Sequence, residues 1–325
     1  MTKMRRILTT LCLISAFTFC KAQPGYQPAY PFEIGLQLGT AVFLGDLGGQ
    51  VGIGRPFLRD TDLGAFQPTV GVFGRWNIGA YFSARLDLNF LMLKGDDRWA
   101  GKKNYSGTDA RGSVDDAWFR WYRQLDFRSR VFEASIAGEI VPYNFELGGG
   151  YQDYSVISPY GLIGLGIFNF KPQGTGPNGG WIDLKPLSTE GQGLVEGRVP
   201  YNLTQLNVPI GLGVKWTYND QWALSLEVNH RLTFTDYIDD ISTDYIDPQI
   251  FYDNMTPDQA DVASFMARKS ILVDPGNVNG IVSAPNEQRG DPKDNDSYYT
   301  ITIRFSYFID PNSVGGGRRY GCPVW

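Results

Sequence analysis

A strict alternation of apolar and polar residues runs from Thr204 to Phe234 and constrains the fold more than any other feature of this chain. A period of two residues is that of a β-strand, so each half of the stretch is predicted to be a strand. Only Asn219, Asp220 and Gln221 separate the halves, which predicts a tight antiparallel hairpin. One parity is apolar and aromatic: Leu206, Val208, Ile210, Leu212, Val214, Trp216 and Tyr218, then Trp222, Leu224, Leu226, Val228, Leu232 and Phe234.

The opposite parity of this hairpin mixes charge with glycine. Lys215, Glu227 and Arg231 stand among small residues such as Gly211 and Gly213. The wet face of a soluble sandwich would be long, polar and open, whereas glycine suits a cramped interior. We interpret the stretch as a hairpin of a membrane barrel, with apolar side chains facing lipid and polar ones facing the lumen.

The first residues carry a secretory signal pattern. Lys3 and Arg5 precede an apolar run at 7–19, and Ala22 supplies the small residue that signal-peptidase cleavage requires. Residues 1–22 are therefore predicted to be a signal peptide that precedes a mature chain starting near Gln23. A lipoprotein reading of Cys20 is the alternative, and the bulky aromatic residues before it oppose this reading.

Composition and charge narrow the class of protein. Beyond the signal, no run approaches the roughly 18 apolar residues that a membrane-spanning helix needs, which excludes a helical membrane protein. A net charge of −5 gives no reason to expect a nucleic-acid partner. With 39 glycines and 14% aromatic residues, composition alone would also suit a soluble secreted β protein.

The same alternation recurs along the chain and predicts eight strands, at 32–44, 66–77, 82–92, 127–141, 158–170, 204–218, 222–234 and 298–309. The fifth has two apolar faces, so its register stays open. Long connections alternate with shorter ones, as in outer-membrane barrels with brief periplasmic turns and extended outer loops. We predict an all-β, eight-stranded antiparallel transmembrane barrel of the OmpA/OmpX up-and-down type, spanning residues 23–309 with long extracellular loops.

This topology also predicts an orientation. The two tight turns, at 78–80 and 219–221, are assigned to the periplasm, together with both chain ends and a C-terminal tail at 310–325. Aromatic residues gather beside these turns, as an interfacial girdle would: Trp76, Tyr81, Trp216, Tyr218 and Trp222. The longest loop, at 235–297, contains a predicted short helix at 257–271. Because the apolar face of the predicted barrel contacts the bilayer, outer-membrane lipid is an expected partner.

Ten charged residues fall on the inward parity, five of each sign: Glu33, Arg75, Arg85, Asp87, Glu133, Glu139, Lys215, Glu227, Arg231 and Arg304. The lumen of an eight-stranded barrel is only wide enough for side chains. Balanced charges in so small a space favour a paired polar plug that conducts nothing. A narrow proton or ion path is the alternative.

No pattern indicates catalysis, a cofactor or a metal. His230 is the single histidine and lies on the outward parity, so it is not expected to be catalytic. The acidic run Asp236, Asp239, Asp240, Asp244 and Asp247 lacks the spacing and glycine of an EF-hand calcium loop, which favours a solvated loop face. The chain also lacks a phosphate-binding glycine loop, a Cys/His zinc pattern and a dinucleotide fingerprint.

Cys322 is the only cysteine expected in the mature chain. It follows Arg318 and Arg319 in the tail, and an odd thiol in an oxidising compartment points to an intermolecular partner or to no partner at all. One hypothesis is a mixed disulfide with a periplasmic protein. The other is a disordered terminus.

Several sequence blocks resemble the PorG-like outer-membrane barrels of Bacteroidetes. They are Glu33-Ile-Gly with Gly45-Asp-Leu, Trp181-Ile-Asp-Leu with Thr189-Glu-Gly-Gln-Gly, Thr233-Phe-Thr-Asp-Tyr-Ile-Asp-Asp-Ile-Ser-Thr and Arg289-Gly-Asp-Pro-Lys-Asp-Asn-Asp. The resemblance covers essentially the whole mature chain and implies an eight-stranded barrel of the type IX secretion and gliding motility apparatus. It also implies that the barrel ties the outer membrane to a periplasmic ring made of PorK and PorN. The family supplies no catalytic residues.

Two other functions stay open at this point. The long outer loops could capture a ligand, which would make the chain a surface-binding barrel. A small pore or a lipid-modifying enzyme is the third possibility.

Overall fold

The computed structural model describes residues 28, 30–47, 63–100, 116–147, 155–218, 221–272 and 283–309. The strands are β1 (Phe32–Leu44), β2 (Gln67–Asn77), β3 (Phe82–Asp96), β4 (Asp126–Ile140), β5 (Phe145–Leu147), β6 (Ser155–Thr175), β7 (Trp181–Asp183), β8 (Thr204–Tyr218), β9 (Trp222–Thr233) and β10 (Ser297–Ile309). The helices are α2 (Asp116–Arg123), α3 (Gln249–Asn254) and α4 (Pro257–Ala267), and short 3-10 turns lie at Leu63–Ala65, Asp97–Ala100, Lys185–Leu187 and Lys269–Leu272.

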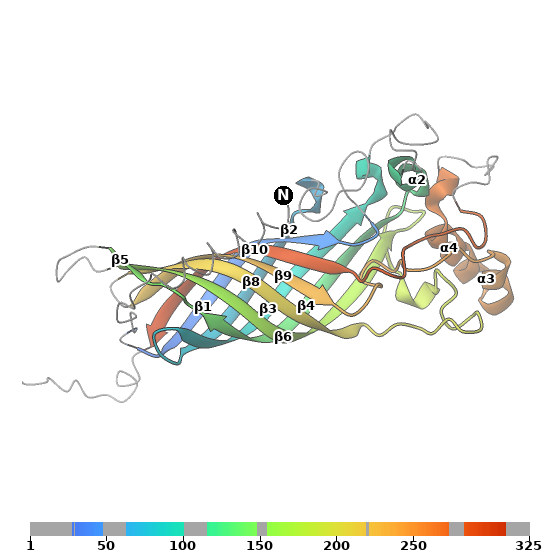
Figure 1. The fold of residues 1–325 in the computed structure, drawn as a ribbon. Helices are drawn as coiled ribbons and strands as arrows, with labels where there is room; N and C mark the ends of the chain where they lie inside the picture. The colour runs from blue at the N-terminus through green and yellow to red at the C-terminus, as the bar shows by residue number, and fades with distance from the viewer. Residues whose placement is uncertain are drawn as a thin grey trace, which may run out of the picture.

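Eight long strands close into an antiparallel barrel (Figure 1). They follow the order β4-β3-β2-β1-β10-β9-β8-β6, and β4 pairs with β6 to complete the ring. This closing ladder runs from the pair Arg128–Gln173 to the pair Ile140–Gly161. The short strands β5 and β7 pair with the two ends of β6. The closed ring confirms the predicted eight-stranded antiparallel barrel. Closure leaves no strand edge unpaired in lipid.

The two ends of the barrel differ. At one end the chain turns quickly from β2 to β3, where Ile78 N–H donates to the carbonyl of Phe82 at 2.9 Å. At the other end lie the helices and the longer connections (Figure 1). We call these the short-turn end and the loop-bearing end. The predicted signal peptide and the tail with Cys322 lie outside the described residues.

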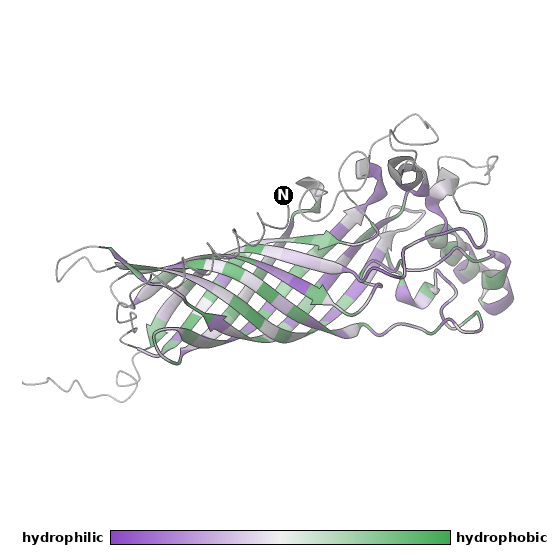
Figure 2. Ribbon diagram, viewed as in Figure 1, coloured by the Kyte–Doolittle hydropathy of each residue, from purple (hydrophilic) through white to green (hydrophobic). Residues whose placement is uncertain are grey.

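The outward face of the barrel is apolar and exposed. Leu212 and Leu165, on neighbouring strands, are 73% and 68% exposed, and Figure 2 shows the apolar positions alternating with polar ones along the strands. Such a belt exceeds any apolar patch that a soluble monomer tolerates, and it fits lipid. The five girdle residues named above are exposed as well. Among the described residues, no helix is long and apolar enough to cross a membrane.

β6 settles the register that the sequence left open. Ile163, Leu165 and Ile167 are exposed on the outside, whereas Phe168 and Phe170 are buried inside. The strand is also longer than expected, at 21 residues. Its inward face turns apolar toward the loop-bearing end, where folded loops rather than charges fill the barrel.

The loops hold more structure than the alternation indicated. The predicted helix at 257–271 is α4 followed by a 3-10 turn, whereas α2 and α3 were not predicted. α3 and α4 pack through a small apolar core of Ile246, Phe251, Ala260, Ala263 and Ala267. This core is built mainly on the two helices, so the strand periodicity gave no sign of it.

Candidate functional site: the lumen and its loop cap

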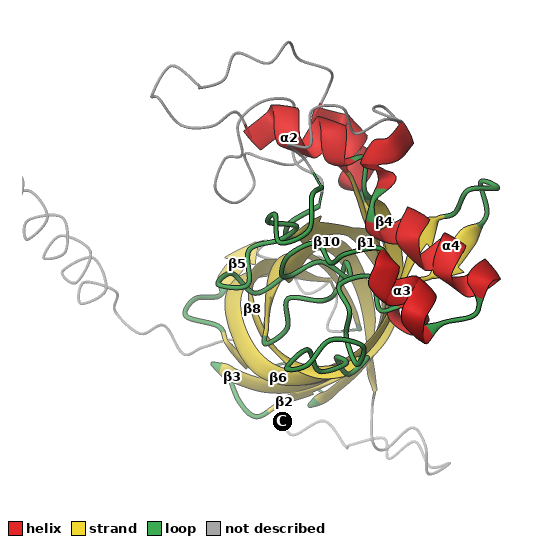
Figure 3. Ribbon diagram, turned by 90° about the vertical axis from the view of Figure 1, so that its right-hand side faces the viewer, coloured by secondary structure: helices red, strands yellow, loops and turns green. Residues whose placement is uncertain are grey.

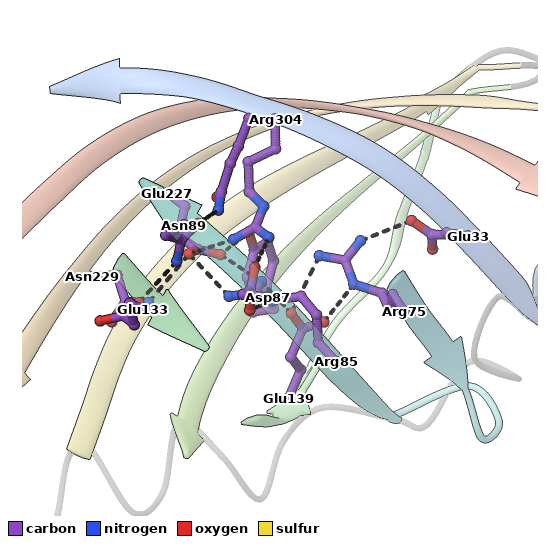
Figure 4. Close-up of polar contacts among 12 residues, drawn as sticks. Glu33, Arg75, Arg85, Asp87, Asn89, Glu133, Glu139, Glu227, Asn229 and Arg304 are labelled. Atoms are coloured by element: carbon purple, nitrogen blue, oxygen red, sulfur yellow. Dashed lines mark hydrogen bonds and ion pairs between the residues drawn. The ribbon is translucent and has the colours of Figure 1, made fainter. Parts of the chain in front are cut away.

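All ten charged residues predicted for the inward parity lie inside the barrel and are at most 5% exposed. They project from seven of the eight long strands and form ion pairs with one another. Two separate groups result, a larger one toward the short-turn end and a smaller one closer to the loops. Figure 4 shows most of them with their neighbours.

The larger group begins with Glu33 of β1. Its carboxylate accepts from Lys215 Nζ at 2.9 Å and from Arg75 Nη1 at 2.8 Å. The guanidinium of Arg75 also lies 2.8 Å from Glu139 of β4, which in turn lies 2.5 Å from Arg85 of β3. Each charge thus meets at least one opposite charge, which is what burial of ions demands.

Arg85 continues the same group toward the centre. It donates to Asp87 and to Glu227 at 2.7 Å each. Arg304 of β10 pairs with the same two carboxylates, at 2.8 Å in the case of Glu227. Tyr160 of β6 adds an O–H donor to Glu227 at 2.7 Å. The network therefore spans the lumen and links walls that are not neighbours in the sheet (Figure 4).

The smaller group surrounds Glu133. Arg231 lies 3.2 Å from its carboxylate, and Tyr298 donates its hydroxyl at 2.6 Å. Asn89 and Asn207 donate side-chain amides at 2.8 and 2.9 Å. Four residues from four strands thus hold one carboxylate, so the group acts as a cross-brace.

The chemistry of these groups suits packing better than proton transfer. Four of the five cations are arginines, and a guanidinium keeps its proton in proteins. A proton moving along the lumen would have to pass through these side chains. Every carboxylate already accepts from a cation, so the network resembles a paired plug more than a relay.

Above the charges, the barrel mouth is filled by apolar side chains and closed by loops. Inward residues of the strands, including Leu91, Val131 and Phe170, join Ile238 and Met266 of the loops in one buried cluster. We call residues 45–47, 184–203, 235–247 and 283–296 the loop cap. Figure 3 looks into the barrel from the loop-bearing end and shows loops lying across its mouth.

A buried ion pair lies at the centre of the loop cap. Arg289 donates to Glu190 at 2.8 Å and to the carbonyl of Asp240 at 2.6 Å. Glu190 also accepts backbone N–H groups of Ser242 and Thr243, at 2.9 and 3.1 Å. One arginine and one glutamate therefore tie three loop segments together.

The acidic run was predicted to be a solvated loop face, and this is wrong for three of its five members. Asp236, Asp239 and Asp240 are buried in the loop cap, whereas Asp244 and Asp247 are exposed. Asp240 accepts from Tyr201 at 2.6 Å and from Thr189. The burial comes from loops distant in sequence that fold over this stretch.

Four of the blocks that carry the family resemblance meet in the loop cap. Asp46 accepts the N–H of Asp291 at 2.8 Å, and Asp296 accepts the N–H of Ile238 at 2.8 Å. The 46–47, 189–193, 233–243 and 289–296 blocks are thus brought together from four separate stretches. Sequence reasoning listed them as motifs but did not foresee their contact.

Four carboxylates of the loop cap lie together without a cation of their own. Within the described residues Asp46, Asp236, Asp239 and Asp296 form no salt bridge. Burial and the neighbouring carboxylates raise the pKa of Asp236 to about 8, and they hold the pKa values of Asp239 and Asp296 well above the ordinary range. Burial also raises the pKa of Asp240 to about 6. These four raised pKa values mean that the carboxyl groups keep their protons to higher pH than free aspartates do.

The other sequence candidates lie elsewhere. His230 is on the outward face of β9, opposite Tyr299 and Ile210 in the two ladders. In the described part of the chain, no group of three or more His, Cys, Asp and Glu is arranged to hold a metal ion. Cys322 lies outside the described residues, so its predicted disulfide stays a prediction.

The sequence profile of the outer membrane protein beta-barrel domain family matches residues 9–255. This match covers most of the chain. The chain belongs to this family. The apolar belt and the closed ladder agree with an outer membrane protein beta-barrel domain. Membership of this family locates the chain in the outer membrane.

Two solved structures are similar to this chain at low sequence identity. Neisserial surface protein A is 8% identical, with a TM-score of 0.34 over 86% of this chain and 97% of that one. The attachment invasion locus protein Ail of Yersinia pestis, solved with the heparin analogue sucrose octasulfate, is also 8% identical. Its TM-score is 0.33 over 85% of this chain and 98% of that one. Among curated proteins, none matches the sequence significantly.

Proposed function

We propose that this outer membrane protein beta-barrel domain is a non-enzymatic structural barrel that anchors other proteins and does not conduct solutes. The main support for a barrel that does not conduct is its filled lumen. Arg85, Arg304 and Glu227 meet at the centre of the lumen, and the loop cap fills the mouth above them. A pore needs an open polar path, whereas these side chains are buried against one another.

The finer proposal is an anchor for a periplasmic ring of the type IX secretion and gliding apparatus, with PorK- and PorN-like partners. The resemblance of the 233–243 and 289–296 blocks to PorG-like barrels supports it. In this arrangement the short-turn end and both termini face the periplasm. The short turns and the tail would then contact the ring, and Cys322 would be placed to form a mixed disulfide with it.

Site-specific photocrosslinking in intact cells tests the anchor. A photoreactive residue at Ile78, an exposed position in the β2–β3 turn, is expected to capture a ring protein. The matched position is Tyr252 of α3, exposed at the loop-bearing end, which should capture none. Capture of ring proteins from Tyr252 and not from Ile78 would reverse the orientation, and no capture from either position would remove the anchor.

Non-reducing gels of membranes test the disulfide separately. Wild-type protein is expected to run partly as a larger species that disappears in Cys322→Ser. An unchanged banding pattern in this variant would eliminate the mixed disulfide while leaving the non-covalent anchor open to the crosslinking test.

A surface-binding barrel is the second candidate, and one observation favours it. The loop-bearing end holds an ordered core of its own around Phe251 and Ala260, which a purely passive loop would not need. If crosslinks from Tyr252 identify an extracellular ligand, and deletion of 249–267 impairs growth on one nutrient, the binding function gains over the anchor.

A further inference from the structure

The outward positions of the eight long strands carry only four Lys or Arg side chains, all on three neighbouring strands at the loop-bearing end. They are Lys94 of β3, Arg128 and Arg130 of β4, and Lys171 of β6. We call these four the basic patch. The outward positions of β1, β2, β8, β9 and β10 have no Lys or Arg.

Strand register brings the four side chains together. Lys94 lies directly opposite Arg128, and Arg130 lies directly opposite Lys171. Neighbouring strands are about 4.8 Å apart, so the patch is small enough for one polyanionic headgroup. Like charges directly opposite each other destabilise a ladder. An anion bound between the two pairs would therefore reduce their repulsion.

One carboxylate pairs with the basic patch, which leaves an excess of positive charge. Asp183 of β7 lies 2.7 Å from Lys171, and both side chains are partly exposed. The next outward acids toward the loops, Asp96 and Asp126, are buried and paired with Arg98 and Lys269. Within the described chain, Arg130 is exposed and has no salt-bridge partner.

Aromatic and amide groups hold two of the cations in place. The guanidinium of Arg128 lies 4.2 Å from the ring centroid of Trp181, and its Nε donates to Gln173 at 3.0 Å. Lys94 lies 5.8 Å from the centroid of Trp99. These contacts orient positive charge without cancelling it.

The basic patch borders the apolar belt. The next outward residue along β4 is Phe132, which is 66% exposed, and Phe90 is its cross-strand neighbour on β3. Ile167 continues the apolar surface on β6. Headgroups of a bilayer lie at the edge of such a belt, and acyl chains lie along it.

We propose that the basic patch binds the phosphate groups of an anionic lipid in the leaflet around the loop-bearing end, with its acyl chains on Phe90, Phe132 and Ile167. Arginine forks fit phosphate oxygens in pairs, and each charge-assisted bond is strengthened beside the apolar belt. A free phosphate ion would use the same cations but would not use the apolar surface. The inference is independent of the periplasmic anchor, because it concerns the opposite end of the barrel.

Native mass spectrometry of the full-length protein in neutral detergent tests the proposal. The probes are diphosphorylated lipid A, the same lipid without its phosphates, and inorganic phosphate. Wild-type protein is expected to retain the diphosphorylated lipid and to release the dephosphorylated one. Arg128→Gln with Arg130→Gln should weaken retention by about tenfold or more, because two cations near the headgroup are lost. The control Lys293→Gln, an exposed loop cation, should retain the lipid as the wild type does.

A second double variant and a folding assay separate loss of lipid binding from misfolding. Lys94→Gln with Lys171→Gln removes the other half of the basic patch, and heat-dependent gel migration shows whether each barrel is folded. Equal retention by wild type and a folded double variant would overturn the proposal. Equal retention of phosphorylated and dephosphorylated lipid, or full displacement by millimolar inorganic phosphate, would also overturn it, the latter in favour of a free anion site.

Discussion

Arg85 Nη1 lies 2.7 Å from Glu227 Oε2 across the lumen, although 142 residues separate them in the chain. Their strands, β3 and β9, are not neighbours in the sheet. Tyr160 of β6 donates to the same carboxylate. One glutamate therefore joins three parts of the barrel wall, and its side chain is buried.

Removing that charge should destabilise the barrel. Glu227→Gln leaves Arg85 and Arg304 with less negative charge in a buried space, so the free energy of unfolding is expected to fall by about 3 kcal/mol. Urea unfolding in lipid vesicles measures the change. Glu196→Gln is the matched control, because Glu196 is exposed in the loops. Equal unfolding midpoints for the two variants would show that the network contributes little.

A methyl group at Gly213 tests how tightly the lumen is packed. A Cβ at this position would enter the ring of Tyr160, so Gly213→Ala should lower the unfolding free energy by about 1–3 kcal/mol. Gly74→Ala is the control, since a Cβ there has no heavy atom within 4 Å. If both variants unfold at the same urea concentration, Tyr160 does not fill the space beside Gly213.

The loop cap should become less stable as pH rises. Its buried acids hold protons when folded, with the pKa of Asp240 raised to about 6 and that of Asp236 raised to about 8. In the unfolded chain they ionise near pH 4, so folding takes up protons above that pH. The contribution of these acids to cap stability is therefore full below about pH 4 and falls progressively as pH rises to about 8.

Hydrogen exchange of the cap amides at pH 5.5 and 8.5, corrected for intrinsic exchange rates, measures this dependence. Greater protection is expected at pH 5.5, because burial and a facing carboxylate, Asp46 for Asp236 and Glu190 for Asp240, disfavour ionisation. Arg289 lowers the pKa of Asp240 only in part, and Arg123 is paired with Asp97. Asp296→Asn, which mimics the protonated form, should flatten the dependence. Asp294→Asn, on the exposed surface, should leave it unchanged. Equal or greater protection at pH 8.5 in the wild type would contradict the buried proton uptake.

The barrel was predictable because its signal is local. The hairpin expected at 204–234 appears as β8 and β9 almost residue for residue, since a period of two fixes both the strand and the face. Charges on the inward parity, such as Arg75 and Glu139, could be placed inside for the same reason. Their individual partners could not be predicted, because strand stagger decides which side chains meet across the lumen.

The loop cap was not predictable in the same way. Asp240 looks like a surface residue in its own segment, and its burial depends on Tyr201 and Arg289, which are 39 and 49 residues away. One signal was available. The inward faces turn apolar toward the loops at Leu91, Leu93, Val131, Phe168 and Phe170, and apolar groups at a barrel mouth require a cover.

The sealed lumen is tested most directly by planar-bilayer recording with wild-type protein and Arg304→Ala. Arg304 pairs with Glu227 and Asp87 at the centre of the network, so the variant is expected to be less stable. Neither protein is expected to raise the membrane current, since the remaining charges and the loop cap still fill the path. Stable ohmic current steps from the wild-type protein, or a large increase in Arg304→Ala, would contradict a closed structural barrel.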